Sequence, residues 1–83
     1  MDPSLAELLR PFLRFLPEGF VLEPDSRLRD LGLDSMHAIQ VLFAVEDSYG
    51  IVLPDHKLTD QTFETAGSLW QAIAETQEME KTP

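Results

Sequence analysis

Apolar residues recur at helical spacing in three stretches of the chain. They span about residues 4–16, 35–49 and 65–76. Pro11 interrupts the first stretch, and proline removes one helical hydrogen bond and clashes with the preceding turn. We therefore predict one kinked helix there, with two short pieces as the alternative. The pattern predicts an all-α domain, a small bundle of three main helices plus one short helix near residues 55–60.

A long loop, residues 17–33, is predicted between the first two helices. Loops of this length are uncommon in compact domains unless they serve a function. Leu28 and Leu31 should pin it to the core. The predicted core consists of Leu8, Phe12, Leu28, Leu31, Leu42, Val45, Tyr49, Leu69 and Ile73. We expect a single domain over residues 1–76 and a disordered tail over 77–83, which lacks apolar periodicity.

The second helix has the clearest boundaries. Gly32 breaks the preceding structure, Asp34 is a good N-cap, Gly50 suits the position just past a helix end, and Pro54 prevents resumption. Ser35 therefore lies in the first turn, where backbone N–H groups lack intrahelical acceptors and the helix dipole favours negative charge. A phosphate joined to the Ser35 hydroxyl would lie where a helix best tolerates an anion.

The same helix carries two apolar faces. At about 100° per residue, one sector forms the core face, which contains Ala38, Val41, Leu42, Val45 and Tyr49. Met36, Ile39 and Phe43 fall on a second stripe that the core does not need. We predict that this stripe docks partner proteins, although a neighbouring loop or the short helix could cover it instead. The predicted partner-binding residues are Met36, Ile39, Gln40, Phe43, Glu46 and Asp47.

Charge and composition narrow the classes of partner. The 83 residues carry a net charge of −9, and residues 34–83, with two lysines and nine acids, account for −7 of it. This disfavours nucleic acid and favours basic protein partners. Without cysteine there is no disulfide or thiolate metal site, and no other metal-ligand pattern is evident. We find no signal peptide or membrane-spanning run, so we expect a soluble cytoplasmic monomer.

The segment Leu31-Gly32-Leu33-Asp34-Ser35-Met36, followed by Tyr49-Gly50 and Leu53-Pro54-Asp55, resembles the modification motif of acyl carrier proteins. The resemblance covers roughly residues 26–73. It implies that Ser35, after Asp34, carries 4'-phosphopantetheine, transferred from coenzyme A by a phosphopantetheinyl transferase. The thiol of this group would hold acyl or aminoacyl cargo as a thioester, and the protein itself would catalyse no reaction.

The resemblance also implies further partners. They would be a loading enzyme, either an adenylating enzyme or an acyltransferase, and downstream synthase or tailoring enzymes. His37 and Gln40 stand where fatty-acid carriers usually have acids. Phe63-Glu64-Thr65 with Ser68-Leu69-Trp70 is similar to freestanding carriers of secondary metabolism. We therefore expect a freestanding carrier of polyketide, nonribosomal-peptide or related natural-product biosynthesis, with fatty-acid and D-alanyl carriers as alternatives.

Two other classes remain for Ser35. A hydrolase would need a base beside the serine, but His37 is two residues along the same helix and points away, His56 is the only other histidine, and no Gly-x-Ser-x-Gly elbow is present. The other class is a helical interaction module without a prosthetic group, or a phosphoserine switch. Both histidines are expected to face solvent.

Overall fold

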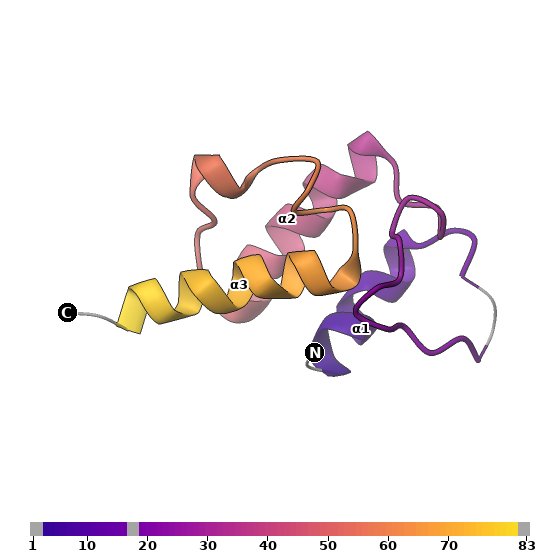
Figure 1. The fold of residues 1–83 in the computed structure, drawn as a ribbon, viewed down its shortest axis with the longest axis horizontal. Coiled ribbons are helices and arrows are strands. Elements are labelled where there is room, and N and C mark those ends of the chain that lie inside the picture. The colour runs from indigo at the N-terminus through magenta and orange to yellow at the C-terminus, as the bar shows by residue number, and fades with distance from the viewer. Residues whose placement is uncertain (1–2, 17–18, 82–83) are drawn as a thin grey trace.

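The computed structural model describes residues 3–16 and 19–81. Within them, helices are joined by loops (Figure 1). The elements in chain order are α1 (Pro3–Leu9), the 3-10 helix η1 (Arg10–Phe12), α2 (Ser35–Tyr49), the 3-10 helix η2 (Asp55–Lys57) and α3 (Ala66–Lys81). In the view of Figure 1, α2 runs obliquely behind α3, and the long loop before α2 closes one end of the bundle. Strand-like pairing in the described residues is limited to one isolated bridge between Arg27 and Thr65. The predicted all-α bundle with a long first loop is confirmed.

The first helix is shorter than predicted. It ends at Leu9 and continues only as the 3-10 turn that contains Pro11. Proline has no N–H to donate to the carbonyl four residues earlier, so the α-helical ladder stops there. The prediction of one kinked helix to residue 16 is therefore wrong. The alternative, two short pieces, is closer to the observed structure. Pro17, the first residue after the predicted helix, lies outside the described residues.

The last helix is longer than predicted. We expected it over residues 65–76 and a disordered tail from 77, but α3 continues to Lys81. Thr65 caps it, because its Oγ1 accepts the Ser68 backbone N–H at 3.0 Å. The sequence beyond Thr76 has weak apolar periodicity but contains good helix formers, which can extend an existing helix one residue at a time. The last two residues of the predicted tail lie outside the described residues.

The core lies between the three helices and is lined by the long loop. Its fully buried large side chains are Leu5, Leu9, Leu28, Val41, Val45, Leu69 and Ile73. The remaining members of the predicted core are partly buried and pack against this cluster; these are Leu8, Phe12, Leu31, Leu42 and Tyr49. Leu5 and Leu9 lie at the centre of the core because they share the face of α1 that points inward.

The long loop is bonded to the start of α3. Ala66 and Gly67 donate their N–H groups to the carbonyls of Ser26, at 3.1 Å, and Pro24, at 2.7 Å. These bonds satisfy first-turn donors that no helical carbonyl can reach. A Cβ atom on Gly67 would lie 2.7 Å from the Pro24 oxygen, which explains a glycine in the first turn of this helix. The loop is thus held in one path before it reaches Ser35.

The segment between α2 and α3 is fixed from both sides. The predicted short helix at residues 55–60 is only the turn η2. The Leu53 N–H donates to Glu46 Oε2 at 3.0 Å, which ties this segment to α2. Lys57 forms an ion pair with Glu75 of α3, and that interaction lowers the pKa of the Glu75 carboxyl.

Candidate functional site

The loop reaches α2 through a glycine that touches another part of the backbone. Gly32 has a φ of 106°, and a Cβ atom there would lie 2.7 Å from the backbone nitrogen of Arg14. The neighbouring Phe15 N–H donates to the Leu31 carbonyl at 2.9 Å. Only glycine combines this φ with such an approach. Residues 14–15 and 31–32 therefore form one rigid unit immediately before the start of α2.

Asp34 caps α2 as predicted. Its backbone is extended, and its Oδ1 accepts the His37 backbone N–H at 2.8 Å. The same oxygen lies 2.7 Å from His37 Nδ1. The hydrogen bond from the His37 N–H, followed by the contact with the ring, lowers the pKa of Asp34, and the nearby Arg14 charge adds to this. The carboxylate next to Ser35 is thus ionised and held in place.

His37 does not face solvent as freely as expected. Its ring is partly buried and turns back to Asp34, whereas His56 is exposed as predicted. The ring therefore reinforces the helix cap. In the described part of the chain, no hydrogen bond joins a histidine to the Ser35 hydroxyl, so a histidine base does not contact this serine.

Ser35 is the first residue of α2 and is exposed. No residue within the described ranges hydrogen-bonds to its hydroxyl. A serine in the first helical turn often bonds a backbone group locally, and this one does not. The hydroxyl is therefore free to react, and it lies at the positive end of a helix of 15 residues.

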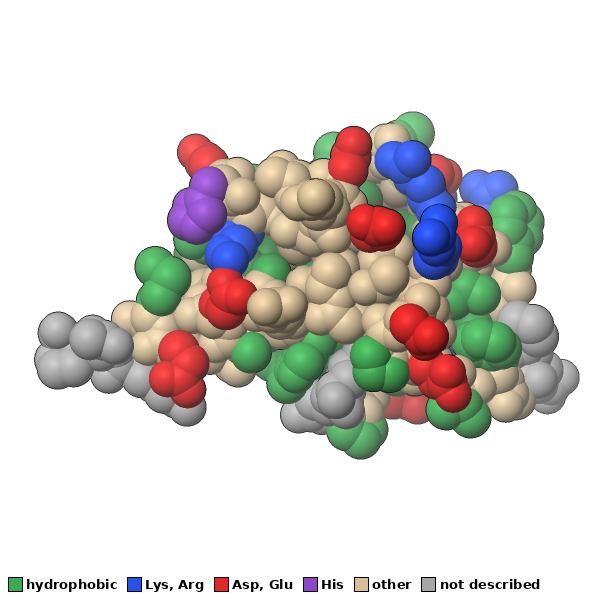
Figure 2. All heavy atoms as spheres, in the orientation of Figure 1, with side chains coloured by type: hydrophobic (Ala, Val, Ile, Leu, Met, Phe, Trp, Pro, Cys, Tyr) green, Lys and Arg blue, Asp and Glu red, His purple; other side chains and the backbone are tan. Residues whose placement is uncertain are grey.

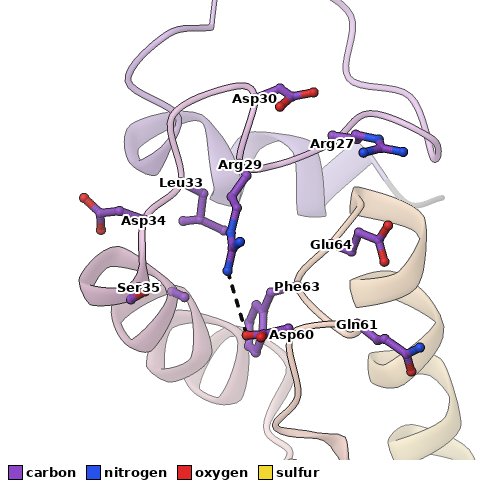
Figure 3. Close-up of a pocket in the computed structure, with 11 residues that line it drawn as sticks. Arg27, Arg29, Asp30, Leu33, Asp34, Ser35, Asp60, Gln61, Phe63 and Glu64 are labelled. Carbon is purple, nitrogen blue, oxygen red and sulfur yellow. Dashed lines mark ion pairs between the residues drawn. The ribbon is translucent and has the colours of Figure 1, made fainter.

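A cavity of about 440 Å³ opens beside Ser35, between the loop before α2 and the segment before α3 (Figure 3). Arg29 points toward Asp60 across it, with 3.9 Å between Nη2 and Oδ1. Both side chains are exposed, so this pair contributes little to stability. The lining mixes charged and apolar groups from Arg27, Arg29, Asp30, Leu33, Asp34, Ser35, Ala38, Asp60, Gln61, Phe63 and Glu64. The serine thus borders open space.

The second apolar stripe of α2 is exposed, as predicted. Met36 is 76% exposed, Ile39 57% and Phe43 63%. The alternative, that a loop or η2 covers these residues, is wrong for the described part of the chain. Gln40 and Asp47 are exposed beside the stripe. Whether partners bind these residues stays a prediction.

Glu46 differs from the other predicted partner-binding residues. It is only partly exposed, and its carboxylate already accepts the Leu53 N–H. It therefore holds the segment after α2 in addition to any role on the surface. Asp47 is the acid at this end of the helix that is fully available to a partner.

Sequence reasoning missed Arg14 and Phe15. Arg14 Nη1 lies 3.7 Å from Asp34 Oδ2, and the Arg14 guanidinium lies 5.8 Å from the centre of the Phe15 ring. We had assigned both residues to the end of a longer first helix. The sequence signal was Pro11, which stops the helix before them. Figure 2 shows Lys and Arg side chains gathered, with acids among them, at the end of the molecule where the long loop lies.

The described residues form neither a cluster of metal-ligating side chains nor a membrane-spanning helix. No group of three or more histidine, cysteine or acidic side chains there is placed to hold a metal ion. None of the helices in residues 3–16 and 19–81 combines the length and apolar character needed to cross a bilayer.

The structure, a small helical bundle with an exposed serine at a helix start, fits the resemblance of its sequence to carrier proteins. The family model described as "phosphopantetheine attachment site" matches residues 3–73, which is most of the chain. The chain belongs to the phosphopantetheine-binding family of acyl carrier proteins. The covalent group of this family is 4'-phosphopantetheine.

A relative of this chain is also described as a carrier protein. Aminoacyl carrier protein 2 of Bradyrhizobium diazoefficiens is 31% identical over 52 residues, which are 63% of this chain and 58% of the relative. This chain therefore aligns with less than two thirds of that relative's length.

Two solved structures have a similar fold. One chain comes from the crystal structure of an engineered Bradyrhizobium japonicum glycine:carrier protein ligase complexed with carrier protein from Agrobacterium tumefaciens and AMP. It is 23% identical with a TM-score of 0.71, covering 94% of this chain and 99% of that one. The other comes from the Bradyrhizobium japonicum ligase complexed with glycylated carrier protein. It is 19% identical with a TM-score of 0.65, covering 86% and 99%.

Proposed function

We propose that this protein carries acyl or aminoacyl groups as thioesters on 4'-phosphopantetheine joined to Ser35, without catalysing a reaction itself. The observation that carries the proposal is the Ser35 hydroxyl, which is exposed, unbonded to any described residue and within the family match over residues 3–73. When bound, the group supplies a thiol, which a chain without cysteine lacks.

The residues around Ser35 fit such a group. Its phosphodiester would lie at the positive end of α2, which stabilises an anion, while the Asp34 carboxylate opposes it. Both effects are weak at this exposed site, because solvent screens them. Arg14 offsets part of the Asp34 charge from 3.7 Å. The cavity beside the serine leaves space for the group to leave the surface.

The proposed loading partner is an adenylating enzyme that attaches an amino acid. This is supported by the relative named an aminoacyl carrier protein and by the fold shared with chains from two ligase–carrier structures. His37 and Gln40, where fatty-acid carriers usually have acids, favour polyketide, nonribosomal-peptide or related natural-product pathways. An acyltransferase remains the alternative loading enzyme.

Partner enzymes are proposed to dock on α2. The exposed stripe of Met36, Ile39 and Phe43 begins one residue after Ser35 and offers an apolar surface. Gln40 and Asp47 beside it would meet polar and basic groups of the partner. A docked enzyme would thus lie near the base of the phosphopantetheine arm.

Intact-mass measurement tests the proposal. The purified chain is incubated with coenzyme A, Mg²⁺ and a broad-specificity phosphopantetheinyl transferase. We expect a gain of one phosphopantetheinyl group and one thiol that reacts with Ellman's reagent. Ser35→Ala should gain neither, while Ser48→Ala, which changes an exposed serine at the other end of α2, should behave as wild type.

Two outcomes would count against the proposed attachment of phosphopantetheine to Ser35. A thiol on folded Ser35→Ala would place the attachment at another residue. Failure of several transferases on folded wild-type protein would make an unmodified interaction module the better account, because the exposed stripe on α2 would still call for a partner.

A further inference from the structure

Phe15 is a large exposed aromatic residue held in a fixed position. It is 65% exposed. Its backbone cannot drift, because its N–H donates to the Leu31 carbonyl at 2.9 Å and because Gly32 lies against residues 14 and 15. An exposed phenylalanine gains little for the fold. Single exposed apolar side chains are common on protein surfaces, so the exposure of Phe15 gains meaning only from the residues beside it.

Arg14 connects the Phe15 ring to the residue before the serine. Its guanidinium lies 5.8 Å from the ring centre, and its Nη1 lies 3.7 Å from Asp34 Oδ2. Phe15, Arg14 and Asp34 thus form a continuous row of side chains that ends next to Ser35. Met36, the residue after Ser35, is also exposed. An apolar side chain from the segment after η1 is therefore linked through Arg14 and Asp34 to the residue before Ser35, and a second one, Met36, follows Ser35 on α2.

We propose that Phe15, oriented by Arg14, is a contact for the phosphopantetheinyl transferase that modifies Ser35. This rests on the proposed function. The transferase must bring the Ser35 oxygen itself into its active site, so it covers whatever surrounds that oxygen. Enzymes that act on the thiol meet the far end of a long flexible arm, so even when docked on α2 they need not cover the Ser35 oxygen or Phe15. The residues closest to Ser35 therefore serve the transferase above all.

The charges around Ser35 suit the same partner. An enzyme that binds coenzyme A must offer cations to its phosphates. Asp30 and Asp34 are exposed near the serine in a chain of net charge −9, and Arg14, Arg27 and Arg29 offset part of their charge locally. Such acids steer a basic surface toward the site but give little apolar contact. Phe15 supplies that contact, since aromatic residues and arginine are enriched in protein interfaces.

The test compares rates of modification of three apo proteins by a broad-specificity transferase with coenzyme A and Mg²⁺. Phe15→Ala should lower kcat/KM about tenfold, a change equivalent to about 1.4 kcal/mol. Val52→Ala is the matched control, because Val52 is 72% exposed but lies past the other end of α2, about 20 Å away along the helix. It should stay within about twofold of wild type. Thermal unfolding should be the same for all three.

Competition separates docking from chemistry. Ser35→Ala protein cannot be modified and should inhibit modification of the wild type. Adding Phe15→Ala to it should weaken that inhibition about tenfold, as expected for loss of an interface contact. If Phe15→Ala proves unstable, Phe15→Leu keeps an apolar side chain and should lose less than the alanine variant.

The outcomes distinguish this inference from the proposed function. If wild type is modified at Ser35 and Phe15→Ala matches Val52→Ala in both assays, the inference is overturned while the attachment site stands. If wild type is never modified, the proposed function fails first, and the inference fails with it.

Discussion

Gly32 lies directly against the backbone of Arg14, so that a Cβ atom on Gly32 would be 2.7 Å from the Arg14 nitrogen. This contact joins the end of the first helical segment to the residues that precede Ser35. It requires glycine for two reasons, the φ of 106° and the lack of space.

Gly32→Ala should therefore destabilise the fold by about 3 kcal/mol or more, adding backbone strain to overpacking. Gly50→Ala is the control, because Gly50 also has a positive φ, 64°, but nothing lies within 4 Å of its added Cβ. It should cost only about 1–2 kcal/mol. Urea unfolding of both variants measures the difference. Equal losses would mean that the close approach to Arg14 does not matter.

The pH dependence of stability should depend partly on Asp34. Its pKa is lowered from the ordinary value of 3.8 in the folded protein, first by the His37 N–H. A carboxyl with a lowered folded pKa stabilises the fold above its unfolded pKa, and this stabilisation is lost as the pH falls below about that value and through the folded pKa. Asp34→Asn keeps a good cap but cannot titrate.

Urea midpoints of wild type and Asp34→Asn, measured from pH 6 to pH 2, check this. The wild type should lose more stability than the variant on acidification. Parallel curves would show that Asp34 titrates alike in the folded and unfolded chains.

Phe43 should matter for partners and not for folding. Phe43→Ala should leave the melting temperature nearly unchanged, because the side chain is 63% exposed. It should weaken binding of a loading enzyme by about 1 kcal/mol or more if the α2 stripe is the docking surface. Val45→Ala, on the buried face of the same helix, should instead cost about 2 kcal/mol of stability. Collapse of the Phe43→Ala protein would place Phe43 in the core.

Glu46 and Asp47 should have different roles, the first in stability and the second in partner binding. Glu46→Ala removes the acceptor of the Leu53 N–H, so it should cost about 1–2 kcal/mol of stability. Asp47→Ala should change stability by less than about 0.5 kcal/mol, since Asp47 is exposed. Its effect should appear as a slower association with a basic partner that is sensitive to salt. Chemical denaturation and stopped-flow binding provide the two measurements.

The sequence alone determined α2 and the place of Ser35. Asp34 and Gly50 are the helix caps that were predicted, and the helix has the predicted limits. The exposed stripe also followed from the spacing of Met36, Ile39 and Phe43. These features were predictable because caps and helical faces depend on residues a few positions apart.

Tertiary structure decided the remaining features. The close packing of Gly67 on Pro24, and the row from Phe15 through Arg14 to Asp34, join residues about 20 to 40 positions apart. No local pattern specifies which distant backbones meet, because that depends on the path of the long loop. The path in turn is set by the burial of Leu28 and by the hydrogen bonds at the start of α3. The surroundings of Ser35 therefore depend on how the long loop packs against the helices, which no local sequence pattern specifies.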